Sequence, residues 1–118
     1  MCGFCGIHWF DPNRPIDKEL LESMTRILEH RGPDDEGIHV EPGLGFGHRR
    51  LSIIGLGDGQ QPMSTEDGSI WVVYNGELYN HPEIRKNLES KGHVYRTSSD
   101  TESFLHLYRE RGLDFLEE

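Results

Sequence analysis

The sequence lacks what a membrane protein, a secreted protein or a nucleic-acid-binding protein needs. No stretch of its 118 residues approaches the apolar run of a membrane-spanning helix. Its start has neither the positive region nor the apolar core of a secretory signal. Only 12 Lys and Arg stand against 21 Asp and Glu, and the formal charge of −9 disfavours nucleic acid and anionic membranes as partners. We therefore expect a cytoplasmic protein that binds neither.

Cysteine is also scarce. Two cysteines, Cys2 and Cys5, are too few and too close together to build a disulfide framework. What is present is an ordinary globular composition, with 34% hydrophobic and 28% charged residues. The length suits one domain with a modest core, so one site is the most that we expect.

Apolar periodicity predicts strands early in the chain and helices around them. Strands are predicted at 3–9, 38–40, 46–54 and 70–74, and helices after Asp17, at Pro82 and after Ser99. The first strand reads as buried, and the last helix begins with a capping box, 99–102. Asn75-Gly76 by itself is typical of a hairpin turn into a strand at 77–79. The elements together predict an α+β or layered fold.

Cys2 is the first candidate for chemistry. Removal of Met1 would leave its thiol and a free α-amine on one residue, which combines a nucleophile with a base. Gly3 keeps the approach to the thiol open. Many proteins have a cysteine at position 2, so this position alone says little.

Acyl transfer from an amide also needs donors for an oxyanion and charges for the two ends of an amino-acid substrate. The Asn75 side chain and the Gly76 N–H are candidate oxyanion donors. Arg50 suits an α-carboxylate, and Glu77 and Asp100 suit an α-ammonium. Each has an ordinary alternative. Asn75-Gly76 suits a hairpin turn, and Arg50 suits a solvated strand residue. Glu77 suits a hairpin charge, and Asp100 suits a carboxylate in the first turn of a helix.

A rival hypothesis is a zinc site, built from Cys2, Cys5 and His8 with a fourth ligand from His30, His48 or His81. A redox Cys-x-x-Cys motif is a second rival. Against zinc, there is no second Cys-x-x-Cys pair or paired His motif, and one strand would place the two cysteines on opposite faces. Against a redox motif, no helix pattern follows the cysteines. We therefore rank acyl transfer first.

Six blocks, taken in order, resemble the class II glutamine amidotransferase domain of glutamine-hydrolysing asparagine synthetases. They lie at 1–6 (MCGFCG), 30–37 (HRGPDDEG), 47–54 (GHRRLSII), 61–63 (QPM), 74–81 (YNGELYNH) and 99–102 (SDTE). The Arg-Gly-Pro-Asp-Asp form is similar to asparagine synthetases rather than to the amidotransferases of purine or amino-sugar synthesis. Cys5 departs from the family, which usually has a small or aliphatic residue there.

The resemblance implies an N-terminal-nucleophile hydrolase fold, an αββα sandwich of two antiparallel sheets between helical layers. It also implies that Cys2 attacks the side-chain amide of glutamine and forms a glutamyl thioester, which water hydrolyses. Asn75 and the Gly76 N–H would form the oxyanion hole. The implied substrate-binding residues are Arg50 for the α-carboxylate, Glu77 and Asp100 for the α-ammonium, and Ile53 and Ile54.

The resemblance implies no metal or cofactor for this chain. In the complete enzymes, ammonia passes to a synthetase domain that uses ATP and Mg to convert aspartate into asparagine. We expect residues 1–118 to be the N-terminal portion of the amidotransferase domain, without the synthetase domain, with incomplete sheets and weak activity alone. A catalytically inactive module and a homodimer stay open as alternatives.

Overall fold

The computed structural model describes residues 1–52 and 57–117, so the predicted substrate residues Ile53 and Ile54 lie outside the described residues. The chain contains both helices and strands, which confirms the predicted mixture of α and β structure. The chain divides into two compact units: Met1–Ile54, Gln60–Pro62 and Val73–Gly76 form the first, and Gly55–Gly59, Met63–Val72 and Glu77–Glu118 form the second.

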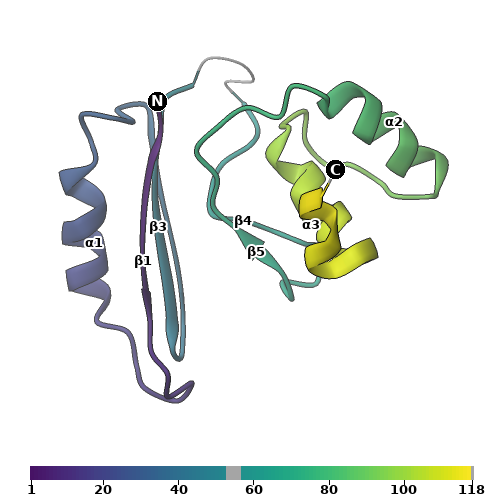
Figure 1. The fold of residues 1–118 in the computed structure, drawn as a ribbon. Coiled ribbons are helices and arrows are strands. Elements are labelled where there is room, and N and C mark those ends of the chain that lie inside the picture. The colour runs from purple at the N-terminus through teal and green to yellow at the C-terminus, as the bar shows by residue number, and fades with distance from the viewer. Residues whose placement is uncertain (53–56, 118) are drawn as a thin grey trace. The chain divides into compact units, whose positions relative to one another are not determined.

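The first unit is a three-stranded antiparallel sheet with a helix along one face (Figure 1). Its strands β1 (Gly3–His8) and β2 (Asp35–Glu41) flank β3 (Leu44–Arg50). Strands β2 and β3 both run up to a two-residue turn, where Gly43 adopts a φ of +82° that a side chain would disfavour. This turn explains why β2 is longer than the predicted 38–40 and why β3 begins before residue 46.

Strand β1 is buried on one face only. Its residues alternate between covered and exposed positions, and Phe4 is 51% exposed. The prediction of a buried strand is therefore wrong for half of its side chains, because successive residues of a strand point to opposite faces.

Helix α1 (Lys18–Ile27) begins at the predicted cap, where the Asp17 carboxylate accepts the Leu20 N–H at 3.0 Å. Leu21 of this helix is fully buried. Glycines let the helix approach the sheet closely, since a Cβ on Gly47 of β3 would lie 1.9 Å from the Thr25 hydroxyl oxygen. The helix ends before the predicted Gly32-Pro33 stop.

The second unit pairs two short strands with two α-helices. Strand β4 (Met63–Ser64) pairs with β5 (Trp71–Val72), and α2 (His81–Ser90), α3 (Thr101–Arg111) and the 3-10 helix η1 (Gly112–Glu117) follow. Its buried apolar residues are Met63, Leu88, Leu105 and Leu107. Both predicted helices are confirmed, and the second ends at Gly112, as its positive φ of 59° favours.

The predicted hairpin at Asn75-Gly76 is wrong. Strand β5 covers two residues rather than five, and its partner is β4 rather than a strand at 77–79. Neither Asn75 nor Gly76 has the positive φ that a type I′ turn requires.

The predicted capping box also differs. The Ser99 hydroxyl accepts the Thr101 N–H at 3.3 Å, but the Ser99 N–H donates to the Thr97 hydroxyl and not to Glu102. The Glu102 carboxylate instead accepts the N–H groups of Arg96 and Thr97 at 2.8 and 2.7 Å. The Ser99 N–H, which would donate to Glu102 in a capping box, is thus bonded to Thr97 in the turn before the helix.

Candidate functional site

Sequence blocks that are far apart in the chain meet at one end of the first unit's sheet. Arg31 Nε donates to the Cys2 carbonyl oxygen at 3.1 Å. The Ser52 N–H donates to Asp34 Oδ2 at 2.7 Å. The Arg-Gly-Pro-Asp loop is therefore bonded both to the N-terminal segment and to the segment that follows β3.

The Cys2 thiol lies against the backbone of Leu51, just after β3. The Leu51 N–H donates to Cys2 Sγ at 3.4 Å, and Sγ lies 3.8 Å from the Leu51 carbonyl oxygen. Cys2 is half-buried, whereas Met1 is 76% exposed. The sulfur is thus held in one place while the residue before it is open to solvent.

Cys5 has different surroundings. Its Sγ lies 3.4 Å from Thr25 Oγ1, so it packs against α1. Among residues 1–52 and 57–117, no group of three or more His, Cys, Asp or Glu could hold a metal ion. The zinc hypothesis therefore gains no support from this part of the chain.

The two neighbouring arginines at the end of β3 differ in burial. Arg49 is 8% exposed, its guanidinium binds Glu36 Oε2 at 2.7 Å, and its Nε donates to the Gly32 carbonyl oxygen at 2.9 Å. Arg50, the predicted carboxylate ligand, is the last residue of β3 and lies opposite Asp35, partly exposed. Of the two neighbours, Arg49 is thus buried and Arg50 is the more accessible.

Asn75 and Gly76 are exposed, and the residue before them is fixed by two interior side chains. The Tyr74 N–H donates to Gln61 Oε1 at 2.6 Å, and His48 Nε2 lies 3.3 Å from the Tyr74 carbonyl oxygen. Burial is the main influence on His48 and lowers its pKa against the raising effect of that carbonyl bond. The neutral ring therefore donates its Nε2–H to Tyr74.

The second unit brings the two predicted ammonium-binding residues near each other in the fold. Asp100 Oδ2 accepts the N–H of Leu78, the residue after Glu77, at 2.8 Å. The Asp100 carboxylate makes no bond to the backbone at the start of α3. Its contact is therefore with the 77–78 segment, and Glu77 itself is exposed.

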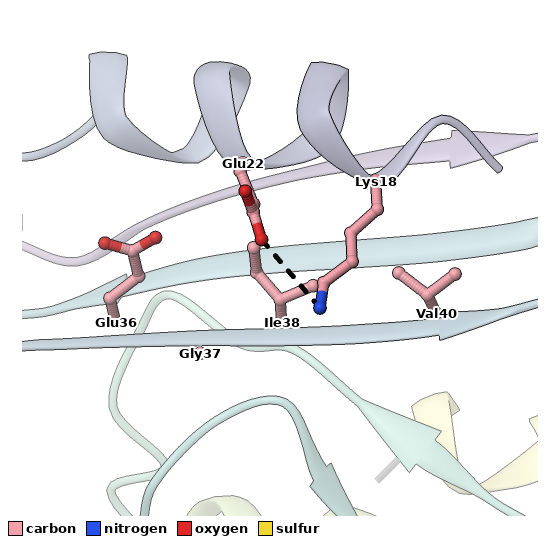
Figure 2. A pocket seen from close by; sticks show the side chains of 6 residues that line it. All are labelled: Lys18, Glu22, Glu36, Gly37, Ile38 and Val40. Carbon is pink, nitrogen blue, oxygen red and sulfur yellow. Dashed lines mark ion pairs between the residues drawn. The ribbon is translucent and has the colours of Figure 1, made fainter.

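A hollow lies elsewhere in the first unit. Figure 2 shows an open pocket of about 500 Å³ between α1 and β2, lined by Lys18, Glu22, Glu36, Gly37, Ile38 and Val40. None of the sequence-predicted site residues lines it. An exposed ion pair between Lys18 and Glu22, at 3.9 Å, stands at its edge. No cysteine, serine or threonine lines this pocket, so we base the candidate site on Cys2.

Sequence reasoning gave no role to Gln61 and considered His48 only as a zinc ligand. Both lie in blocks that resemble the amidotransferase family, 61–63 and 47–54, and that position was the one sign in the sequence that they matter. Their common target, the backbone of Tyr74, is visible only in the fold.

Within the described residues, no helix combines the length and the apolar character needed to cross a membrane.

Comparison with known proteins identifies similar sequences. A family model described as a glutamine amidotransferase domain matches residues 1–118. Glutamine-hydrolysing asparagine synthetase 1 of Bacillus subtilis (strain 168) is 45% identical over 111 residues, which cover 92% of this chain and 18% of the relative. Asparagine synthetase 2 of the same organism is 43% identical, over 100% of this chain and 16% of the relative. Asparagine synthetase 3 of Arabidopsis thaliana is 39% identical, over 99% of this chain and 20% of the relative. The chain thus spans no more than a fifth of these curated relatives.

Proposed function

Because the chain belongs to the glutamine amidotransferase domain family, we propose that residues 1–118 are the N-terminal portion of such a domain and take part in hydrolysing glutamine to glutamate and ammonia. The observation that carries the proposal is the placement of Cys2. Its thiol is held against Leu51 directly after an exposed Met1, in the same unit as Asn75 and Gly76. We place the reaction in the cytoplasm.

The reaction proceeds through the sulfur of Cys2 after loss of Met1. The α-amine takes the thiol proton, and the sulfur attacks the side-chain amide carbon of glutamine. The oxygen of that amide gains negative charge, which the Asn75 amide and the Gly76 N–H stabilise. The carbon–nitrogen bond breaks, and the α-amine returns the proton to the leaving ammonia. Water then hydrolyses the thioester, which releases glutamate and restores the thiol.

The other predicted residues hold the substrate in this proposal. Arg50 binds the α-carboxylate, for which a planar guanidinium is well suited. Glu77 and Asp100 bind the α-ammonium, and Ile53 and Ile54 contact the substrate. The contact of Asp100 with the 77–78 segment supports assigning the two carboxylates to one substrate group.

The ammonia serves a second reaction in the complete protein. The similar asparagine synthetases are named as glutamine-hydrolysing, and this chain spans only a fraction of their length. We assign the ATP-dependent conversion of aspartate to asparagine, with Mg, to a synthetase domain beyond these residues. We also propose the αββα sandwich as the complete fold, which the antiparallel order β1-β3-β2 under α1 supports.

The test is the intact mass of the chain after treatment with a chloromethyl ketone analogue of glutamine. We expect one adduct on the chain that lacks Met1, and Cys2→Ala should lose both the adduct and ammonia release above background. Cys5→Ala is the matched control, because its thiol packs against Thr25 instead.

Labelling that survives Cys2→Ala, or that is lost in Cys5→Ala, contradicts the proposed nucleophile. Absence of any adduct on a folded, processed chain favours the catalytically inactive alternative.

A further inference from the structure

We propose that Gln61 and His48 are positioning residues of the reaction. They fix the backbone of Tyr74 and, through it, the oxyanion donors of the next two residues, Asn75 and Gly76. The inference rests on the proposed function, in which that pair forms the oxyanion hole.

Both backbone groups of Tyr74 are bonded to side chains from elsewhere in the first unit. Its N–H donates to Gln61 Oε1 at 2.6 Å, and its carbonyl oxygen accepts from His48 Nε2 at 3.3 Å. These partners lie 13 and 26 residues away in sequence. The peptide that leads into Asn75 is thus fixed from both sides by long-range contacts.

The two side chains are themselves confined. His48 is 1% exposed and Gln61 is 9% exposed. A buried side-chain polar group that loses its partner is destabilised by its desolvation penalty, so the His48 and Gln61 side chains favour keeping their bonds to Tyr74. The two hydrogen bonds therefore restrain Tyr74 and, with it, the position of the residues that follow.

Glycine on the edge strand allows this packing. A Cβ on Gly37 would lie 1.9 Å from the Gln61 carbonyl oxygen, and Gly37 is paired with His48 across β2 and β3. The backbone of Gln61 therefore approaches the sheet directly beside His48. Any side chain at residue 37 would push Gln61 away from Tyr74.

The ring of Tyr74 restrains the oxyanion segment from a third side. A Cβ built on Gly76 would lie 2.6 Å from the Tyr74 hydroxyl oxygen, so the ring folds back over Gly76. Residue 74 is thus bonded at its N–H and its carbonyl, and a side chain at residue 76 would require the end of the Tyr74 ring to move.

Oxyanion donors act only when they are close to the place where charge develops. Removal of one such donor typically lowers kcat by about 10²–10³-fold. Catalytic groups must be held within about 0.5 Å of the productive geometry. Releasing Tyr74 should therefore lower kcat by about 10-fold or more and leave substrate binding nearly unchanged.

The test compares two reactions of Cys2 in the full chain that lacks Met1. Hydrolysis of L-glutamic acid γ-(p-nitroanilide) passes through an oxyanion, whereas alkylation of the thiol by iodoacetamide does not. Gln61→Leu and His48→Phe should lower kcat for p-nitroaniline release about 10-fold with KM within about 3-fold, and should leave the alkylation rate unchanged.

Two variants complete the design. Gln61→Glu keeps an acceptor oxygen for the Tyr74 N–H and should retain most of the activity, even if Gln61→Leu fails to fold. Gln60→Leu changes an exposed glutamine next in the chain and should behave like the wild type. Retained kcat in Gln61→Leu and His48→Phe, or an equal fall of both reactions, overturns the inference.

Asn75→Ala separates this inference from the proposed function. If Asn75→Ala slows p-nitroaniline release and the Gln61 and His48 variants do not, only the inference is wrong. If Asn75→Ala leaves p-nitroaniline release unchanged, or the wild-type chain releases no p-nitroaniline, the proposed function and the inference are both wrong.

Discussion

The two units of this chain are held together by different interactions. The first relies on backbone pairing between three strands and on glycines that let chains approach closely, and among its described residues Leu21 is the one fully buried apolar side chain. In the part of the second that the structure describes, four apolar residues are buried and the strands are only two, of two residues each. Side-chain hydrogen bonds around the buried Glu102 join its segments.

The difference bears on where chemistry can be placed. Cys2, Arg50, Asn75 and Gly76 belong to the first unit, where backbone and interior contacts fix their neighbours. Backbone pairing leaves little room for adjustment, which suits groups that must be held in position during a reaction. The second unit contributes Glu77 and Asp100, which are proposed only to bind a charged end of the substrate.

Each unit contains one tryptophan, so each can be followed separately. Trp9 belongs to the first unit and Trp71 to the second. In Trp71→Phe and Trp9→Phe backgrounds, fluorescence during urea unfolding reports the first and the second unit respectively.

The largest expected effect is a glycine substitution in the first unit. A Cβ on Gly32 would lie 2.3 Å from the Arg49 carbonyl carbon, a backbone atom within the paired sheet. We expect Gly32→Ala to lower the free energy of unfolding of the first unit by about 3 kcal/mol, at the upper end of overpacking effects. The Trp9 signal measures this loss.

Gly57→Ala is the matched substitution in the second unit, where no atom of residues 1–52 or 57–117 is found within 4 Å of the added Cβ. It should change the Trp71 transition by less than about 0.5 kcal/mol. Equal losses for the two alanine variants would contradict the distinction between the units.

The next effect concerns Glu102, which is 2% exposed and accepts three hydrogen bonds from Arg96 and Thr97. We expect Glu102→Gln to lower the free energy of unfolding of the second unit by about 2 kcal/mol, because bonds to a charged acceptor are lost. The Trp71 signal measures the loss. Glu83→Gln changes an exposed carboxylate of the same unit and should have almost no effect.

Acid should distinguish Glu102 from the histidines. Burial acts to raise the pKa of Glu102, but hydrogen bonds from Thr97 and Arg96 outweigh it, and the net pKa is lowered. The stability that this carboxylate contributes is present above about pH 4.5, the ordinary value, and is lost as the pH falls through the folded pKa. Burial lowers the pKa values of His48, His81 and His106, so both units lose stability below about pH 6.5.

The second unit should therefore show a further loss below about pH 4.5 that is smaller in Glu102→Gln. A loss of the same size in the variant would show that other carboxylates are responsible.

The smallest expected effect is at the surface of the first unit. Lys18 and Glu22 lie 3.9 Å apart with side chains 67% and 32% exposed, at the edge of the open pocket (Figure 2). Glu22→Gln should change the free energy of unfolding by less than about 0.5 kcal/mol in low salt. A loss above about 1 kcal/mol in the Trp9 signal would mean that surface charge contributes to this unit as much as its sheet contacts do.

Local signals in the sequence predicted local structure. The cap at Asp17 and the end of α3 at Gly112 were predicted from adjacent residues and are confirmed. The hairpin predicted at Asn75-Gly76 is wrong because the turn signal is local. The preceding residue, Tyr74, is bonded to Gln61 and His48 from distant parts of the chain. The predicted capping bond of Glu102 is wrong for a related reason, since the Ser99 N–H donates to the Thr97 hydroxyl.

The candidate site was predictable only as a set of residue types in recognised blocks. Nothing near Arg49 and Arg50 in the sequence says which of the two is buried, because their order follows from the pairing of β3 with its neighbours. The predicted roles of Cys2, Asn75 and Gly76 stay predictions until the labelling experiment is done.

The bond from Arg31 to the carbonyl oxygen of Cys2 bears on how the protein would mature. An aminopeptidase that removes Met1 cuts the peptide on the amino side of Cys2, and this bond lies on the other side. The same holds for the contact between Cys2 Sγ and Leu51. With Cys2 as the proposed nucleophile, the newly made chain would be a zymogen in which the thiol is already in place, and activation would need one cleavage and no refolding.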